Sequence, residues 1–416
     1  MLHTCLNIIE EKRCVGCGNC VSACPTGCFV LAKDPAGFVT AQVKNDFASR
    51  CKKCGLCEKR CPEMQKSAEI PPPETIPCYA AWHKDPVVVQ NSTSGGAFYA
   101  LACSFLARGG IVAGVAMQSN TAVYRFAASK EELNELQGSK YIPADITEFY
   151  PELSAALESG RAVMITLLPC TAKAIRLRFH KYIADGKLFI IDFICAGVPA
   201  PEYFRKEMGA RGVTIRKFRV KDGVKRFWKN SNALIGVKVA TETPVDIPIS
   251  RSPFYNGFAC NLILRKSCYD CNHATLARSG DITLADFWGE TRFPEQQKAG
   301  ISMILLNTET GKELFADARK DLIAETASLT DAARKNPRLY FGKKHQMQTY
   351  LYRKFPDIIS WAPLFVLNFL YGGGYRRFLL RKLPYKLLWR KHGKTARALE
   401  MEREKKFEDV FNAKAN

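Results

Sequence analysis

The chain has 416 residues, of which 47% are hydrophobic and 24% are charged, and its formal net charge is +21. This composition fits a globular protein of two or three domains and excludes a fibrous or low-complexity chain. The 17 cysteines, together with a start that has no basic and apolar leader segment, indicate a reducing compartment. No run of 18 uncharged apolar residues occurs. We therefore expect a cytoplasmic protein without a membrane span.

The first 66 residues contain one cysteine spacing twice. Residues 14–25 and 51–62 both read C-x2-C-x2-C-x3-C-P. This spacing is typical of proteins with two 4Fe-4S clusters, in which the fourth cysteine of each run binds the other cluster. Zinc sites and disulfide frameworks have different spacings. We predict one cluster on Cys14, Cys17, Cys20 and Cys61, and a second on Cys51, Cys54, Cys57 and Cys24.

Short structural elements are expected around these cysteines. Strands are predicted near 6–9 and 38–41, with a helical turn after each cysteine run. Residues 67–78 include three consecutive prolines and are expected to form a stiff extended linker. Residues 1–66 would thus be a separate domain.

From residue 79 to about 345 the pattern alternates between strands and helices, which predicts an α/β domain. Strands are expected at 79–82, 111–117, 162–168 and 188–194, with helices at 94–106, 130–137 and 146–159 and a basic helix ending near residue 182. If the last two strands are parallel, Cys170 and Cys195 follow them at one edge of the sheet. Residues 214–240 alternate like an added antiparallel segment.

A further pair, Cys268 and Cys271, precedes a strand-like stretch at 282–285. A lone C-x2-C serves zinc, redox pairs and clusters alike. With Cys170 and Cys195 it would complete four thiolates for a third 4Fe-4S cluster, with Cys260 as a substitute ligand. The alternative is a set of inert buried thiols.

The last 70 residues, from about 346 to 416, are predicted to be a basic helical tail. Residues 375–397 include nine Lys or Arg and no acid, and residues 361–371 are apolar but too short to cross a bilayer. This pattern suits a helix on an anionic membrane surface, and equally a helix packed on the domain with a solvated basic face. Nucleic acid is not expected as a partner, because the basic run has no recognition motif.

The motifs taken together resemble the beta subunit of coenzyme F420 hydrogenases and dehydrogenases. The resemblance runs from Cys14 to about Leu306. It lies in the cysteine sets and in residues 94–96, 138–141, 168–170, 195–201, 268–271 and 286–289. The resemblance implies a ferredoxin-like α+β dicluster domain, an α/β flavin-binding domain, and electron transfer between clusters, FAD and an organic acceptor. Where the family often has Gly-Thr-Pro-Cys-Gln, this chain has Leu-Leu-Pro-Cys-Thr at 167–171.

Candidate flavin and catalytic residues follow from these motifs. Lys140 could neutralise an anionic reduced flavin, and Asp286 could transfer a proton. The alternatives are a capped helix start after Ser94 and a surface turn at 139–141. His83, His180 and His273 are candidate proton donors. The predicted cofactor-binding residues are Ser94, Gly95, Gly96, Ser139, Lys140 and Tyr141.

The partners expected from this interpretation are a ferredoxin or other redox protein and a small-molecule substrate or glycan precursor. The latter follows from bacterial members of the family that lack the deazaflavin coenzyme and occur among surface-polysaccharide genes. Contact with the inner face of a membrane would go through the basic tail. A different class remains open, in which the chain is an electron-transfer subunit of a larger redox complex without its own substrate site.

Overall fold

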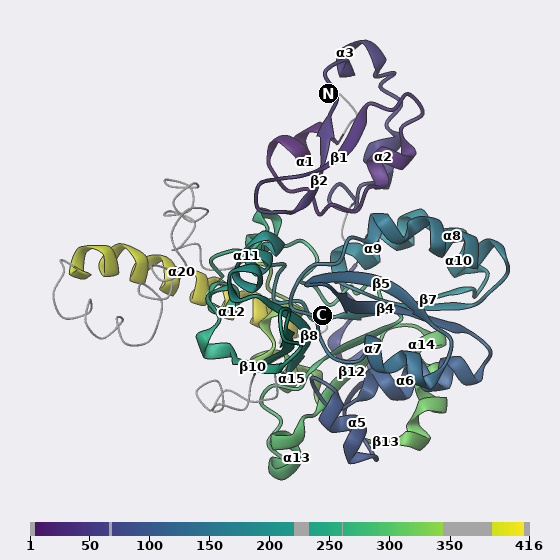
Figure 1. Cartoon of the computed structure of the whole chain (residues 1–416), viewed down its shortest axis with the longest axis vertical. Coiled ribbons are helices and arrows are strands. Elements are labelled where there is room, and N and C mark those ends of the chain that lie inside the picture. Colours follow the sequence, from purple (N-terminus) through teal and green to yellow (C-terminus); the bar gives the residue numbers. More distant parts are fainter. Residues whose placement is uncertain (1–4, 66–68, 220–232, 260, 344–384, 412–416) are drawn as a thin grey trace.

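The computed structural model describes residues 5–65, 69–219, 233–259, 261–343 and 385–411. Figure 1 shows a small amino-terminal module beside a larger body, which is built on a wide twisted sheet. The proline-rich segment lies between module and body.

The amino-terminal module, residues 5–65, is built around a two-stranded antiparallel sheet in which Phe29 pairs with Val43. The segment at 6–9, predicted as a strand, is a helix instead, because Cys5 and Ile8 are both buried at the i, i+3 spacing of one helical face. The predicted helical turns lie inside the cysteine runs, each after a glycine with positive φ. The elements are α1 Leu6–Glu10, α2 Asn19–Ala23, β1 Phe29–Lys33, β2 Val39–Val43, α3 Phe47–Arg50 and α4 Leu56–Arg60.

The large sheet has eight strands in the order β13-β3-β12-β11-β7-β6-β4-β5. Its centre, from β11 through β7 and β6 to β4, is parallel, so the condition for placing Cys170 and Cys195 at one edge of the sheet is met. The remaining strands join antiparallel. The strands are β3 Cys78–His83, β4 Ile111–Gln118, β5 Thr121–Ala127, β6 Val163–Leu167, β7 Leu188–Phe193, β11 Ile282–Asp286, β12 Ser302–Leu306 and β13 Leu322–Thr326.

Helices cover both faces of this sheet, because successive residues of its central strands point to opposite sides. In β7, Ile191 packs with α6, α7 and α14, whereas Ile190 packs with α8 and α9 on the other face. Helix α7 is capped by Ser129, whose Oγ accepts from Glu132 N, and the Glu132 carboxylate accepts from Ala128 N. The helices are α5 Pro86–Asn91, α6 Ala97–Ala107, α7 Lys130–Leu136, α8 Tyr150–Glu158, α9 Pro169–Arg178, α10 His180–Ala184, α13 Pro294–Ala299, α14 Glu309–Ala318 and α15 Leu329–Lys335.

A second sheet forms the added segment. Its three strands are antiparallel, which confirms the antiparallel segment predicted at 214–240. Their apolar side packs on Phe204 and Phe254. The turn signals at 222–223 and 229–232 lie outside the described residues. The elements of this segment are α11 Pro201–Arg211, β8 Val213–Arg219, β9 Ala233–Lys238, β10 Pro244–Pro248 and α12 Pro253–Ala259.

The body also contains short 3-10 turns. They are Pro73–Thr75, Ile146–Phe149, Ile249–Arg251, Lys266–Tyr269, Arg319–Asp321 and Pro337–Leu339.

The end of the chain forms helix α20, Tyr385–Phe411. Its last turns pack on the body, where the rings of Phe407 and Phe411 lie 5.4 and 5.6 Å from the ring of Tyr340. The side chains of the basic residues 375–397 lie outside the described part of the chain, so the choice between a membrane surface and a packed helix stays a prediction. The apolar stretch 361–371 lies outside the described residues. Among the residues that the structure does describe, no helix has both the length and the apolar character needed to cross a membrane.

Candidate redox site

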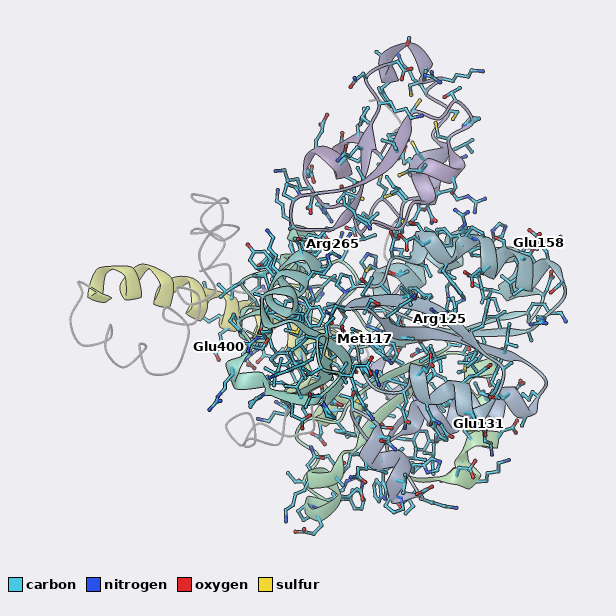
Figure 2. All side chains as sticks on the ribbon, in the orientation of Figure 1. Met117, Arg125, Glu131, Glu158, Arg265 and Glu400 are labelled. Atoms are coloured by element: carbon cyan, nitrogen blue, oxygen red, sulfur yellow. The ribbon has the colours of Figure 1, made fainter. Side chains whose placement is uncertain are left out.

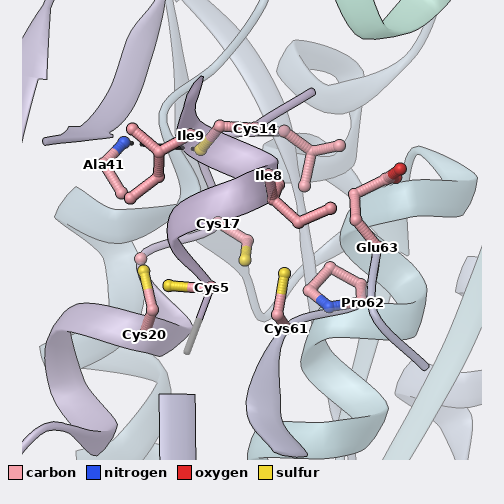
Figure 3. Close-up of a pocket in the computed structure, with 12 residues that line it drawn as sticks. Cys5, Ile8, Ile9, Cys14, Cys17, Cys20, Ala41, Cys61, Pro62 and Glu63 are labelled. Atoms are coloured by element: carbon pink, nitrogen blue, oxygen red, sulfur yellow. Dashed lines mark hydrogen bonds between the residues drawn. The ribbon is translucent and has the colours of Figure 1, made fainter. Parts of the chain in front are cut away.

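The first predicted ligand set comes together in the module. Cys14, Cys17, Cys20 and Cys61 line one pocket, with Ile8, Pro62 and Glu63 around them (Figure 3). Burial, together with the neighbouring thiols of Cys20 and Cys14, raises the pKa of Cys61 to about 12. Cys61 thus joins the thiols of the other run, which is the crossed arrangement that two cubes require.

Cys5 lies in the same pocket, although it has no ligand spacing in the sequence. In Figure 3 its sulfur lies beside that of Cys20. Hydrogen bonds to Cys20 and Cys57 raise the pKa of Cys5 and lower that of Cys57 to about 6. Cys20 and Cys57 belong to different predicted sets, so the two sets are neighbours.

The second predicted set is more open to solvent. Cys54 is exposed, Cys57 is buried, and Cys24 and Cys51 are partly exposed. The backbone N–H of Cys28 lies 3.3 Å from the sulfur of Cys24. Such N–H donors stabilise the negative charge of cluster thiolates.

The third predicted set also comes together, from three separate segments of the body. Cys170 is the second residue of α9, and Cys195 follows β7. Cys268 and Cys271 lie in and just after a 3-10 turn. Burial and the neighbouring thiols of Cys271, Cys195 and Cys268 raise the pKa of Cys170 well above its usual range. Cys260, the possible substitute, lies outside the described residues.

Backbone donors already point at this third set. Gly197 N lies 3.3 Å from the sulfur of Cys195, and Val198 N lies 3.4 Å from that of Cys268. In the described ranges, no three His, Cys, Asp or Glu side chains could hold one metal ion together. The two backbone N–H groups would stabilise negative charge on the thiolates of Cys195 and Cys268.

Arg265 connects the first and third sets. Its Nη1 donates to the carbonyls of Cys14, at 3.4 Å, and Val39, at 3.2 Å, and Figure 2 places it at the boundary between module and body. Burial raises the pKa of Cys14, Cys170 and Cys268, and the positive charge of Arg265 partly offsets this rise. Among the described residues, its buried Nε has no hydrogen-bond partner. A guanidinium in this position fits two anionic clusters, one on each side.

A second link runs from the module to the third set. His273 Nε2 lies 2.6 Å from Glu63 Oε1, and both side chains are buried. Glu63 also accepts from Arg13 at 3.1 Å and from Asn272 at 3.2 Å. The predicted proton donor His273 is therefore held by a carboxylate of the module.

The predicted flavin and catalytic residues lie on the body. Burial raises the pKa of Asp286 to about 6, while the neighbouring Ser94 side chain opposes the rise. Burial also raises the pKa of Tyr141 well above its usual range, and the nearby charges of Tyr255 and Asp286 contribute. Ser94, Tyr141 and Asp286 thus meet in one region. The ring of Tyr141 packs edge-on to that of Tyr255 at 5.6 Å.

Lys140 and Ser139 hold the adjoining loop. Burial and the charge of Lys217 lower the pKa of Lys140 to about 7. Its Nζ donates to the carbonyls of Glu135, at 2.8 Å, and Gln137, at 3.1 Å. Ser139 N donates to Thr93 Oγ1 at 2.7 Å, which joins this loop to the residues before Ser94. The predicted flavin segments are therefore neighbours.

The two glycines of the first flavin segment have structural roles of their own. A Cβ on Gly95 would lie 2.4 Å from the carbonyl oxygen of Ala81 and 2.7 Å from Ser302 N, so this position needs glycine to pack against β3 and β12. Gly96 has a φ of +88° and precedes α6 directly. The helix start is thus fixed by backbone packing and conformation, and Ser94 Oγ donates to Ile301 O at 2.6 Å instead of capping.

Fold and site together define an iron–sulfur redox protein with a ferredoxin-type module. Comparison with protein families agrees: a 4Fe-4S dicluster domain matches residues 13–64. The chain belongs to the coenzyme F420 hydrogenase/dehydrogenase beta subunit family, whose amino-terminal part matches residues 78–149 and whose carboxy-terminal part matches residues 160–332.

Individual relatives are distant. An uncharacterized protein of Methanocaldococcus jannaschii, MJ1349, is 27% identical over 160 residues, which are 32% of this chain and 43% of that protein. An uncharacterized ferredoxin of the same organism, MJ0722, is 34% identical over 55 residues, 13% of this chain and 66% of the ferredoxin. The chain thus covers less than half of the first relative. A chain of the F420-reducing [NiFe] hydrogenase complex from Methanosarcina barkeri, 15% identical, superposes with a TM-score of 0.42 over 63% of this chain and 89% of its own.

Proposed function

We propose that this chain is an iron–sulfur flavoprotein oxidoreductase that relays electrons between a redox protein and an organic substrate or deazaflavin-type coenzyme. The observation that carries the proposal is the position of the third cysteine set. It adjoins the dicluster module through Arg265 and through the contact of His273 with Glu63. Strands β7 and β11 pair in parallel with Phe193 opposite Leu284, so Cys195 and Asp286 both follow this pair at the same edge of the sheet.

The residues present fit both kinds of cofactor. Clusters would exchange single electrons and FAD would exchange a hydride, chemistry that belongs to the cofactors themselves. Cys170, Cys195, Cys268 and Cys271 would hold the third cluster. Tyr141 would supply an aromatic wall for the flavin ring, with Ser94 and Ser139 as polar contacts.

Two titratable groups would move or hold protons there. Asp286, with its pKa near 6, can hold a proton close to neutral pH, which a freely exposed carboxyl cannot. Lys140, with its pKa near 7, exists in both protonation states at neutral pH and could neutralise negative charge on the ring. Arg265 would oppose the negative charge of the clusters on either side.

The deciding measurement is iron, acid-labile sulfide and flavin per chain on anaerobically purified protein, with visible spectra before and after dithionite. About twelve irons and one FAD are expected. About eight irons with FAD would remove the third cluster and keep the oxidoreductase. About eight irons without flavin, even after reconstitution with FAD, would overturn the relay.

A second candidate is an electron-transfer subunit without its own substrate site, which the match to a beta subunit favours. Such a chain would pass electrons to an acceptor only in the presence of a partner subunit. Turnover of a deazaflavin or an artificial hydride acceptor by the isolated chain would exclude it.

A further inference from the structure

The two cysteine runs share one spacing but differ in charge. Residues 14–24 include no charged side chain, whereas residues 50–60 include five basic residues and one acid. Cluster binding needs the cysteines, glycines and prolines that both runs share, so it does not explain the lysines of the second run. Another interaction has to account for them.

The first run is covered by the body. Tyr150 Oη donates to the carbonyl of Cys17 at 2.7 Å, and Asn19 Nδ2 donates to the carbonyl of Ala174 at 2.9 Å. A Cβ on Gly18 would lie 2.9 Å from the methyl carbon of Thr147. This side of the module is therefore an internal interface, and a neutral, closely packed surface suits it.

The second run faces solvent. Cys54, Lys52, Lys53 and Lys59 are exposed, and Leu56 is 40% exposed, one of few large apolar side chains on the described surface. In Figure 1 helix α3, which ends immediately before this run, lies at the end of the module farthest from the large sheet. The surface of these five residues, the Cys54 surface, thus combines a thiol of the second set, an apolar residue and three lysines.

The other two basic residues of the run are already engaged. Arg50 forms an ion pair with Asp46, and Arg60 donates to the carbonyl of Leu177 on the body. No ion pair involves Lys52, Lys53 or Lys59 within the described part of the chain. Their charge is thus directed outward.

We propose that the Cys54 surface is the docking site for an acidic electron-carrier protein. Charged rims around a small apolar centre steer a partner of opposite charge and allow fast, weak association. The exposed thiol would bring such a carrier next to the second set, while the first set faces Arg265 and the body. The inference rests on the proposed function in taking the partner to be a redox protein.

The test is calorimetric titration of the cluster-loaded chain with an acidic ferredoxin that contains two 4Fe-4S clusters. The variant is Lys52→Glu/Lys53→Glu. The matched control is Lys130→Glu/Lys320→Glu. Both lysines are exposed on the body, and the charge of each lowers the pKa of Cys103, so they lie near each other. At about 20 mM salt we expect Kd to rise at least about tenfold for the variant and less than about twofold for the control. The difference should shrink at about 0.5 M salt.

Equal Kd values for wild type and variant, or an equal loss in the control, would overturn the proposal. Binding of duplex DNA in place of ferredoxin, lost in the same variant, would overturn it as well. Iron content and the dithionite spectrum of every variant report separately on the relay. A chain that lacks FAD yet binds ferredoxin through Lys52 and Lys53 would disprove the relay and leave the docking site standing.

Discussion

His273 Nε2 and Glu63 Oε1 approach to 2.6 Å across the boundary between module and body. Glu63 comes two residues after Cys61, and His273 two residues after Cys271, so this contact ties the first cysteine set to the third. Burial would raise the pKa of Glu63, but the hydrogen bond and charge of His273 and the charge of Arg13 outweigh it and hold the pKa below its usual range. The carboxylate is therefore a fixed anchor for the module.

We predict that Glu63→Gln loosens this anchor. The amide keeps the shape but removes the charge that His273 and Arg13 bind, which should lower the free energy of unfolding by about 2 kcal/mol. Thermal unfolding and hydrogen exchange of residues 5–65 would measure it. The exposed Glu69→Gln is the control. Unchanged exchange in the module would show that the contact does not hold it in place.

Cys271→Ser should remove the third cluster alone. The thiols of Cys170, Cys195 and Cys268 would lose their fourth partner, while the first and second sets lie in the module. Iron should fall from about twelve to about eight per chain. Cys103→Ser, which changes a half-buried thiol outside the three sets, should keep all the iron. An unchanged iron count in Cys271→Ser would contradict the ligand assignment.

Asp286→Asn should change how stability depends on pH. The folded pKa is about 6 and the ordinary value is 3.8. Between pH 3.8 and pH 6 the folded state binds more protons than the unfolded state. The free energy of unfolding therefore falls as pH rises through this range. The loss is complete once the buried carboxyl has ionised, above pH 6. The amide carries no such penalty. We expect the stability advantage of Asp286→Asn over wild type to be about 2–3 kcal/mol larger at pH 8 than at pH 4.

Chemical denaturation at the two pH values would check this prediction, with the flavin content recorded for each sample. A stability difference that is the same at pH 4 and pH 8 would show that Asp286 does not titrate in this range. If the carboxyl also handles a proton in turnover, the pH profile of wild type should contain a step near 6 that is missing in the variant.

Two ion pairs of the body should differ sharply in their effect on stability. Asp192 and Arg278 are 3.0 Å apart with side chains that are 0% and 1% exposed, whereas Arg108 and Asp317 pair at 2.6 Å on the surface. Asp192→Ala leaves a buried guanidinium without its partner and should cost about 3–5 kcal/mol. Asp317→Ala should cost less than about 1 kcal/mol. Similar losses of unfolding free energy in both variants would contradict the importance of burial here.

Local sequence patterns predicted much of this protein because they act over a few residues. The spacing of each cysteine run fixes where three thiols can point, and the parallel strands before Cys170 and Cys195 follow from buried apolar runs. The same reasoning failed at 6–9, where a four-residue apolar stretch fits a strand or a helix. It also missed β12 and β13, which pair with the distant strand β3, and β5, which forms a tight hairpin with β4.

Local spacing and composition identify the two cysteine runs, the change to an α/β pattern after the prolines, and the candidates for the third set. Which of these residues meet depends on contacts between distant segments. Cys5, Arg265 and Glu63 have no motif, because their roles arise from contacts between segments that are far apart in the chain. Cysteine spacing encodes short-range geometry, whereas the contact of Glu63 with His273 forms across 210 residues, and only once module and body have packed.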